Sequence, residues 1–405
     1  MLRARRPSEG ENGLNTHYPK DETEVAGLVR DAAAAAKTIR ILGGGTRSAI
    51  GHPVEADRVL SLGHLSGITL YEPAALTLVA RAGTPLAEIE ATLEGEGQML
   101  PFEPADYRAL LASSGEPTLG GMFAAGLSGP RRIQTGACRD AAIGVGFVDG
   151  SGEILKSGGR VMKNVTGYDL VKLQCGAWGT LGVVTEIAFK LLPKPETTTT
   201  LVLRGLDDVR AIEALSKALA SPFGVSGAAH LPGDRTLVRV EGFVNSVAHR
   251  AESLRSELSA FGDAEALSDA ADNKALWAGI ANVEVLSGKP GSPGSGAVWR
   301  VSLKPSDGPK LVAELRRALD VEAVYDWGGG LVWLLVPQQG DAGASLIRKA
   351  LSPLGGHATL IRAGGETRRT VPVFQPETPT IAAISAGLRQ QFDPKGILNP
   401  GLMDQ

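Results

Sequence analysis

The chain has 405 residues, and at about 100–200 residues per domain this length predicts two to three domains. Hydrophobic residues make up 43% and charged residues 21%, as in ordinary globular proteins, but the 52 glycines exceed the usual share of about 7%. The formal net charge is −3, basic and acidic residues are mixed along the chain, and aromatic residues make up 5%. This composition disfavours nucleic-acid binding and binding to an anionic membrane surface.

Targeting and metal-binding signals are weak. The basic N-terminus has no apolar segment behind it, so it is not expected to be a signal peptide, and no apolar run approaches the ~20 residues that span a bilayer. Two cysteines without a CxxC motif exclude a self-contained iron–sulfur cluster, and the six histidines are scattered singly, so no metal site is expected. The sequence thus predicts a cytoplasmic protein, associated with a membrane at most through a partner protein.

The first predicted elements lead into a glycine-rich loop. Asp21 is expected to cap a helix over residues 22–37, and the strand Ile39–Leu42 then delivers Gly43–Ser48 (GGGTRS). Two further strands, Val59–Leu62 and Leu76–Ala82, and a helix that begins at Thr84-Pro85 and ends at Gly95 are expected next.

Gly115–Gly129 (GEPTLGGMFAAGLSG) is the most unusual stretch of the chain. Glycine inside an element costs roughly 0.5–1 kcal/mol relative to alanine, so this density is expected where backbone must approach a ligand closely. Pro117 fixes the entry dihedral and Thr118 supplies a cap, while Gly120 and Gly121 are expected to leave bare N–H groups at a helix start. Such a segment is a typical seat for a pyrophosphate.

The next segment, up to residue 195, holds a third group of glycines. The sequence DGSG at 149–152 predicts a hairpin between two strands. Gly176, Gly179 and Gly182 come just before a strand over Val183–Leu192. A change of composition at PKP (193–195), followed by four threonines, marks the expected domain boundary.

The second half of the chain shows one order of elements twice. Strand, helix, strand, strand and helix are expected between residues 201 and 261, and the same order recurs between residues 297 and 361. Two copies of such a unit predict one antiparallel sheet with helices on one face. A last helix, Ile381–Phe392, and an extended tail close the chain.

Common nucleotide and hydrolase motifs are not satisfied. At the first loop Ser48 stands where the third glycine of a GxGxxG fingerprint is required, and no acidic ribose partner follows. In Gly121–Ser128, Leu127 stands where a P-loop needs lysine, and no GxSxG elbow occurs. Nicotinamide binding, nucleoside triphosphate hydrolysis and acyl transfer are therefore disfavoured.

Five motifs in a fixed order carry a resemblance to a known family. They are GGGT at 43–46, PTLGG at 117–121, KNVTGYDL at 163–170, GTLGVVTEI at 179–187 and FDPKGILNPG at 392–401. With this combination the chain resembles the FAD-linked oxidases of the vanillyl-alcohol oxidase and p-cresol methylhydroxylase (PCMH) type. It resembles in particular the FAD-binding (GlcE) subunits of bacterial glycolate oxidases, over residues 17–402.

The resemblance implies an α+β fold with a PCMH-type FAD-binding domain of two subdomains, followed by an antiparallel-sheet cap domain with helices on one face. The implied divisions are a flexible tail at 1–16, the FAD-binding domain at 17–195 and the cap domain, for substrate or partner, at 196–378. A C-terminal helix and tail at 379–405 are expected to pack back on the FAD-binding domain.

The resemblance also implies the contacts with FAD. The expected cofactor-binding residues are Gly43, Gly44, Gly45, Thr46, Arg47, Ser48, Pro117, Thr118, Leu119, Gly120, Gly121, Gly129, Gly182, Val183 and Val184. The first two loops are expected at the pyrophosphate, and Gly182–Val184 at the adenosine. Relatives with covalently bound flavin have a histidine in place of Thr46, so non-covalent FAD is expected.

One departure from the family bears on catalysis. Catalytic subunits of the 2-hydroxy-acid branch carry an HxGDGNxH-like stretch that supplies metal ligands and acid–base groups. The equivalent here, Gly355–Arg362, has one histidine, His357, and no acidic partner. Catalytic residues are therefore unassigned, and His357, Arg300 and Arg362 are candidates for binding a substrate carboxylate.

The resulting hypothesis is an FAD-binding subunit of a glycolate oxidase (dehydrogenase) complex in glyoxylate metabolism. It would oxidise glycolate to glyoxylate together with a catalytic FAD subunit and an iron–sulfur subunit, and would be inactive alone. Two alternatives stay open: a stand-alone FAD-dependent 2-hydroxy-acid oxidase or dehydrogenase, and a redox-inert flavin-binding scaffold.

Overall fold

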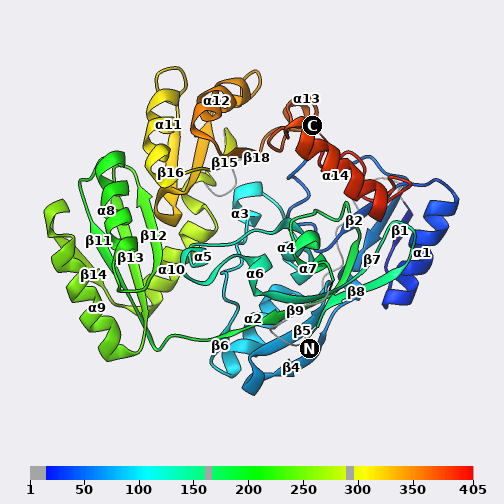
Figure 1. Ribbon diagram of the computed structural model, residues 1–405, viewed down its shortest axis with the longest axis horizontal. Helices are drawn as coiled ribbons and strands as arrows, with labels where there is room; N and C mark the ends of the chain where they lie inside the picture. Colours follow the sequence, from blue (N-terminus) through cyan, green and yellow to red (C-terminus); the bar gives the residue numbers. More distant parts are fainter. Residues whose placement is uncertain (1–14, 160–166, 289–295, 405) are drawn as a thin grey trace.

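The computed structural model describes residues 15–159, 167–288 and 296–404. Its elements form two regions that lie side by side along the longest axis (Figure 1). The first region contains the glycine-rich loops, and the second is built on one large sheet. The short helices α3 (Arg108–Leu111) and α5 (Arg132–Thr135) lie between the two regions (Figure 1).

The first region holds two main sheets. A parallel sheet has the order β1-β3-β2, and an antiparallel sheet has the order β4-β5-β9-β7-β8. The strands are β1 (Asn15–His17), β2 (Ile39–Leu42), β3 (Arg58–Ser61), β4 (Ile68–Glu72), β5 (Thr77–Arg81), β7 (Ala142–Val148), β8 (Ile154–Gly158) and β9 (Val183–Lys190), with the additional pair β6 (Gln98–Met99) and β10 (Leu192–Pro193). The helices are α1 (Glu22–Ala34), α2 (Leu86–Gly95), α3 (Arg108–Leu111), α4 (Leu119–Ala125), α5 (Arg132–Thr135), α6 (Cys138–Ala141) and α7 (Leu170–Gln174).

Local signals explain several of these elements. The Asp21 side chain accepts from the N–H of Glu24 at 2.9 Å and caps α1, as predicted. The hairpin between β7 and β8 is also confirmed. The start of α2 differs from the prediction, because Pro85 is the N-cap and the Thr84 hydroxyl donates to the carbonyl of Arg81 at 2.7 Å instead of capping the helix.

The second region is an eight-stranded antiparallel sheet with the order β14-β11-β13-β12-β16-β17-β15-β18. Its strands are β11 (Thr197–Leu203), β12 (Val225–Leu231), β13 (Arg235–Gly242), β14 (Ala264–Leu267), β15 (Ala297–Ser302), β16 (Glu322–Asp326), β17 (Leu331–Val336) and β18 (His357–Arg362). Its helices are α8 (Asp208–Ala220), α9 (Val244–Glu257), α10 (Ala270–Ala281), α11 (Gly308–Leu315) and α12 (Ala344–Leu351). Each half of the sheet repeats one strand–helix–strand–strand–helix–strand order, and the halves join where His230 pairs with Tyr325. The predicted repeat is confirmed.

The helices do not all cover one face of this sheet. Leu201 and Leu203 point into a core shared with α8, α9, α11 and α12, whereas Val202 points into a second core that contains Trp277 of α10. The second core also receives Tyr107 and Leu110 from the first region. The four helices of the repeated unit thus lie on one face of the sheet, as predicted, whereas α10, which lies outside the repeat, is on the face turned toward the first region.

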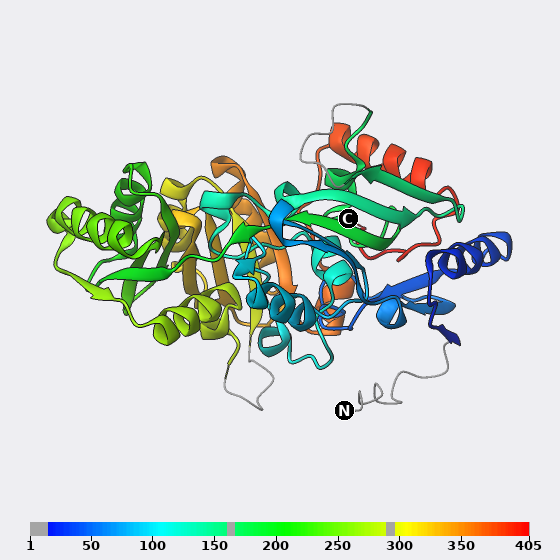
Figure 2. The ribbon, with the colours of Figure 1, turned by 90° about the horizontal axis from the view of Figure 1, so that it is seen from below.

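The chain returns to the first region at its end. After α13 (Gly365–Thr370) and α14 (Pro379–Phe392), Leu398 forms a parallel bridge with Ile39 beside β2. Figures 1 and 2 show α14 beside the first region. Among the described residues, no helix is long and apolar enough to cross a bilayer, and no group of metal-ligating side chains is assembled.

Candidate cofactor-binding site

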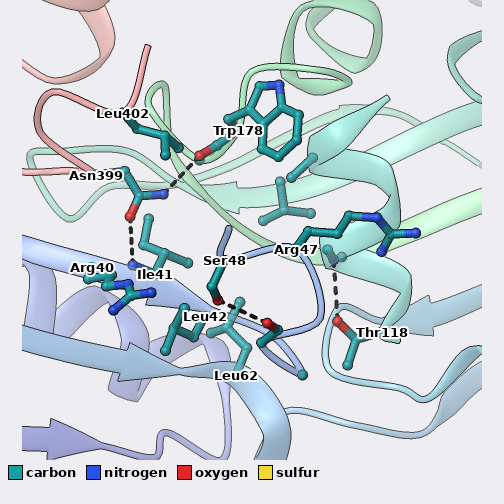
Figure 3. A pocket seen from close by; sticks show the side chains of 18 of the residues that line it. Arg40, Ile41, Leu42, Arg47, Ser48, Leu62, Thr118, Trp178, Asn399 and Leu402 are labelled. Atoms are coloured by element: carbon teal, nitrogen blue, oxygen red, sulfur yellow. Dashed lines mark hydrogen bonds between the residues drawn. The ribbon is translucent and has the colours of Figure 1, made fainter. Parts of the chain in front are cut away.

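A cavity in the first region is lined by all three glycine-rich segments and by the C-terminal tail (Figure 3). The predicted residues that line it are Gly43, Gly44, Gly45, Thr46, Arg47, Ser48, Thr118, Gly120, Gly121, Gly182 and Val184. Segments as far apart in sequence as β2 and residue 402 therefore meet around one space.

Glycine is required at two positions of the first loop, because the backbone of this loop contacts the second loop directly. A Cβ on Gly44 would lie 1.6 Å from the carbonyl oxygen of Glu116, and a Cβ on Gly43 would lie 2.3 Å from Oγ1 of Thr118. No side chain fits at such distances, since the contact at Gly44 is with backbone. The two loops thus form one wall of the cavity by direct backbone contact.

The first loop also offers free donors. Within the described parts of the chain, no hydrogen bond is donated by the backbone N–H of Gly44, Gly45, Thr46 or Arg47. Nε of Arg47 is buried without a partner, while its Nη2 donates to the carbonyl of Ala105 at 2.5 Å. Unsatisfied N–H groups and a buried cation beside a cavity suit a phosphate group.

Burial lowers the pKa of the Arg47 guanidinium, because removal from water disfavours its charged form. Tyr107 and Asp106 oppose this shift only in part. An anion in the cavity would stabilise the charged form further, so the residues present fit the diphosphate of FAD.

The second loop does not provide the donors that the sequence predicted. The N–H of Gly120 donates to the carbonyl of Ala82 at 2.7 Å, and the N–H of Gly121 donates to the Thr118 hydroxyl at 3.3 Å. Both groups are therefore already paired, and the expectation of bare N–H groups at this helix start was wrong. Gly120 is needed because α4 packs on the end of β5, where its Cβ would lie 2.6 Å from Cβ of Ala82.

The third loop is held by the C-terminal tail. The Asn399 side chain accepts from the N–H of Ile41 and donates to the carbonyl of Trp178, both at 2.8 Å (Figure 3). Gly179 has φ +71°, and a Cβ there would lie 2.8 Å from Nδ2 of Asn399. Asn399 thus links β2 to the third loop at the edge of the cavity.

Sequence reasoning missed part of the lining. His52, Trp178, Asn399 and Leu402 line the cavity but were not among the predicted contacts. The FDPKGILNPG motif was a signal for the tail, although it gave no role to Asn399. His52 is held by Nδ1, which lies 2.6 Å from the carbonyl oxygen of Arg368.

Four predicted contacts do not line this cavity. They are Pro117, Leu119, Gly129 and Val183. Leu119 and Val183 are fully buried in the hydrophobic core of the first region. Gly129 accepts from the indole Nε1 of Trp327 at 3.1 Å, which places it at the second region. Residues 163–166 of the KNVTGYDL motif lie outside the described residues.

The three candidates for carboxylate binding are separate from this cavity. The Arg362 guanidinium donates to the carbonyls of Gly296, Leu110 and Ser287, so its donors are used in holding the fold. Arg300 and His357 lie on β15 and β18, on the face of the large sheet that is turned toward the first region.

A buried network of four charges joins the two regions. Arg131 binds Glu241 through two hydrogen bonds of 2.8 and 3.1 Å, and Arg239 binds Glu103 through two of 2.8 and 3.0 Å. Although burial alone would raise it, the guanidinium groups of Arg239 and Arg131 lower the pKa of Glu241 to about 2. This network fixes β13 against the loops of the first region.

Comparison with known proteins places the chain in a family. The family model described as "FAD binding domain" matches residues 15–158. The chain is 35% identical over 376 residues to "Glycolate oxidase subunit GlcE" of Escherichia coli K12, covering 93% of this chain and 95% of that protein. The chain belongs to the GlcE family of FAD-linked oxidoreductases. Its cofactor is FAD.

Other comparisons concern part of the sequence or the fold alone. "Glycolate oxidase subunit GlcD" of Bacillus subtilis is 32% identical over 185 residues, which are 45% of this chain and 38% of that protein. 4-Ethylphenol oxidase from Gulosibacter chungangensis superposes with a TM-score of 0.70 at 16% identity, covering 96% of this chain and 88% of that one. p-Cresol methylhydroxylase has a TM-score of 0.68 at 15% identity, with the same coverage. The predicted PCMH-type fold is thus confirmed.

Proposed function

We propose that this chain is the FAD-binding subunit of a glycolate oxidase complex that oxidises glycolate to glyoxylate with a catalytic FAD subunit and an iron–sulfur subunit. The observation that carries the proposal is the similarity to a GlcE subunit over 95% of that protein's length. The glycine-walled cavity with its free N–H groups supports a role in holding FAD.

Within this proposal the first loop, Gly43–Ser48, holds the FAD diphosphate, and Gly182 and Val184 meet the adenosine. Thr118 and Gly121 shape the cavity wall. Pro117, Leu119, Gly129 and Val183 support these segments from outside the cavity. FAD is bound without a covalent link, because Thr46 takes the place of the histidine that links flavin in some relatives.

The proposed division of the chain follows the same reasoning. The tail is 1–16, the FAD-binding domain is 17–195, the cap domain is 196–378, and the C-terminal helix and tail are 379–405. The bridge between Leu398 and Ile39 and the bonds of Asn399 support the return of the tail to the FAD-binding domain.

The need for partners follows from what this chain lacks. When bound, FAD supplies the two-electron acceptor for alcohol oxidation. With two cysteines and no CxxC motif, the chain has no ligand set for an iron–sulfur cluster that would pass electrons onward. The Gly355–Arg362 stretch offers one histidine and no acidic partner for proton transfer, so we propose that the chain is inactive alone. Any membrane association would come from the partner subunits.

A second candidate is a stand-alone FAD-dependent 2-hydroxy-acid dehydrogenase. The position of Arg300 and His357 on one sheet face, turned toward the FAD-binding region, favours it. A redox-inert flavin scaffold remains as an outcome of the test.

Anaerobic reduction of bound FAD by glycolate tests the proposal. Bleaching of the flavin absorbance is followed with the isolated chain and then after each partner subunit is added. We expect no rapid bleaching of the isolated chain and rapid bleaching in the complete complex. Rapid bleaching of the isolated chain that is lost in His357→Ala would favour the stand-alone enzyme. No bleaching in any combination would favour the scaffold.

A further inference from the structure

Two guanidinium groups share one indole ring at the boundary between the two regions. Cζ of Arg132 lies 4.3 Å from the ring centre of Trp327, and Cζ of Arg300 lies 5.2 Å from it. The indole is fixed, since Trp327 is 8% exposed and its Nε1 donates to the carbonyl of Gly129 at 3.1 Å. An aromatic face attracts cations, but two cations on one ring repel each other.

Neither guanidinium group forms a direct ion pair. Within the described residues, the side chains of Arg132 and Arg300 take part in no hydrogen bond and no salt bridge. This contrasts with the neighbouring Arg131, whose donors are used by Glu103 and Glu241. The fork of N–H donors on Arg132 and on Arg300 is therefore available to a ligand.

Asp326 is a buried acidic residue whose charge acts on Arg300, but it is poorly suited to neutralise that guanidinium group. Burial raises its pKa to about 7, against the lowering effect of the hydrogen bond from the N–H of Trp327. A carboxyl group that is substantially protonated near neutral pH neutralises little positive charge. The half-buried guanidinium of Arg300 thus keeps much of its positive charge uncompensated, whereas Arg132 is exposed and has Asp140 as an acidic neighbour.

His357 adds a third polar group on the same side of the sheet. In the register of β15 and β18, Ser302 pairs with His357 and Arg300 pairs with Thr359. Paired residues of an antiparallel ladder point to the same face, and diagonal neighbours lie about 7–8 Å apart. Burial lowers the pKa of His357, and the charges of Arg300 and Arg132 lower it further, which agrees with their proximity.

We call the group of Arg132, Arg300 and His357 the cluster. Two aromatic side chains, Tyr107 and Trp333, lie between the cluster and the FAD cavity. The Tyr107 ring lies 5.9 Å from Cζ of Arg47, which lines the cavity, and 5.7 Å from the Trp333 ring. Trp333 pairs directly with Arg300 across β15 and β17. His357 and Arg132 are exposed while Arg300 lies deeper, so the cluster is open to solvent at one side.

We propose that Arg300, Arg132 and His357, arranged around the Trp327 indole, bind the carboxylate group of a small 2-hydroxy acid. The planar fork of arginine matches a carboxylate in two parallel hydrogen bonds, and the indole fixes both forks. The choice of a 2-hydroxy acid rests on the proposed function, whereas the preference for a carboxylate follows from these residues alone.

Isothermal titration of the isolated FAD-loaded chain tests this site without requiring turnover. The probes are oxalate, which FAD does not oxidise, glycolate, and glycolamide as the neutral analogue of glycolate. We expect oxalate and glycolate to bind, and glycolamide not to bind. Arg300→Met should weaken oxalate binding by about tenfold or more, as for loss of a charged hydrogen bond.

The matched control is Arg317→Met, since Arg317 is exposed after α11, on the other face of the sheet, and pairs with Glu314. It should bind oxalate like the wild type. If Arg300→Met does not fold by circular dichroism, Arg132→Met provides the same test. The site is refuted if the wild type binds no oxalate, or if folded Arg300→Met or Arg132→Met retains wild-type affinity.

The proposed function can fail independently. A complex that does not oxidise glycolate, together with arginine-dependent oxalate binding by the isolated chain, would overturn the function and retain the carboxylate site. Glycolate oxidation by the complex without any oxalate binding to this chain would overturn the carboxylate site and retain the proposed function.

Discussion

The packing of α4 on β5 predicts opposite effects for two adjacent glycines that both line the FAD cavity. In Gly120→Ala the new Cβ would lie 2.6 Å from Cβ and 2.9 Å from the carbonyl oxygen of Ala82. These atoms belong to backbone or to a side chain that cannot rotate away, so α4 must move. The movement also strains the 2.7 Å bond from the N–H of Gly120 to Ala82.

The expected magnitude follows from three contributions. Overpacking costs typically 1–3 kcal/mol, and a weakened backbone hydrogen bond costs about 0.5–1.5 kcal/mol. Replacing glycine by alanine in a helix returns about 1 kcal/mol. The free energy of unfolding should therefore fall by roughly 0.5–3.5 kcal/mol in Gly120→Ala. In Gly121→Ala the nearest atom is Oγ1 of Thr118 at 3.2 Å, which can shift, so stability should stay equal or rise by up to about 1 kcal/mol.

Urea denaturation of the FAD-free variants, followed by circular dichroism, measures this contrast. Flavin occupancy of the same preparations is measured separately, because an effect on phosphate contacts would lower occupancy without lowering the stability of the FAD-free protein. Equal stability of the two variants, or a larger loss in Gly121→Ala, would refute the packing argument.

Three further predictions concern the cofactor link and two buried carboxyl groups. Acid precipitation should release the yellow colour into the supernatant, since Thr46 cannot form the histidyl link; flavin left in the pellet would contradict this. The pKa of Asp326 is raised to about 7, so the folded state holds a proton between about pH 4 and 7 that the unfolded state has lost, and stability falls as pH rises, by about 1.4 kcal/mol per pKa unit. Asp326→Asn should remove this dependence, and parallel urea curves at pH 5 and pH 7.5 for both proteins check it. The pKa of Glu241 is lowered to about 2, so its stabilisation is complete above its unfolded pKa of about 4.3 and is lost as pH falls toward 2. Glu241→Gln should cost about 3–5 kcal/mol at pH 7, and a difference that does not shrink toward pH 2 would argue against the ion pairs.

Local elements could be predicted because their signals are local. Asp21 caps α1, and the hairpin at 149–152 forms, since each depends on a few neighbouring residues. Glycine density also identified the segments around the cavity, because backbone contact such as that between Gly44 and Glu116 leaves no room for a side chain.

The hydrogen-bond acceptors of the N–H groups in the glycine-rich loops could not be predicted, because they depend on tertiary packing. The sequence of α4 looks the same whether the N–H of Gly120 meets a phosphate or the carbonyl of Ala82. Likewise, the bond between Asn399 and Ile41 joins residues 358 positions apart, and no local pattern encodes such a contact.

The position of α10, a helix outside the predicted repeat, could not be predicted for a related reason. Its Trp277 packs over Gly227, where a Cβ would lie 2.7 Å from the indole, and its Nε1 donates to the Thr200 hydroxyl at 2.8 Å. Gly227 on β12 and Thr200 on β11, the two strands that flank β13, form a seat for the indole on one particular face. That match is visible only when all three strands are in register.

The most direct test of the central claim is titration of the FAD-free protein with FAD, comparing the wild type with Gly44→Ala. The methyl group would lie 1.6 Å from the carbonyl oxygen of Glu116 and separate the two loops that wall the cavity. Gly27→Ala is the control, because nothing lies within 4 Å of a Cβ at that position of α1. The account predicts one FAD per chain, displaceable by ADP, for the wild type and Gly27→Ala, and no measurable binding for folded Gly44→Ala. Wild-type affinity in folded Gly44→Ala would contradict it.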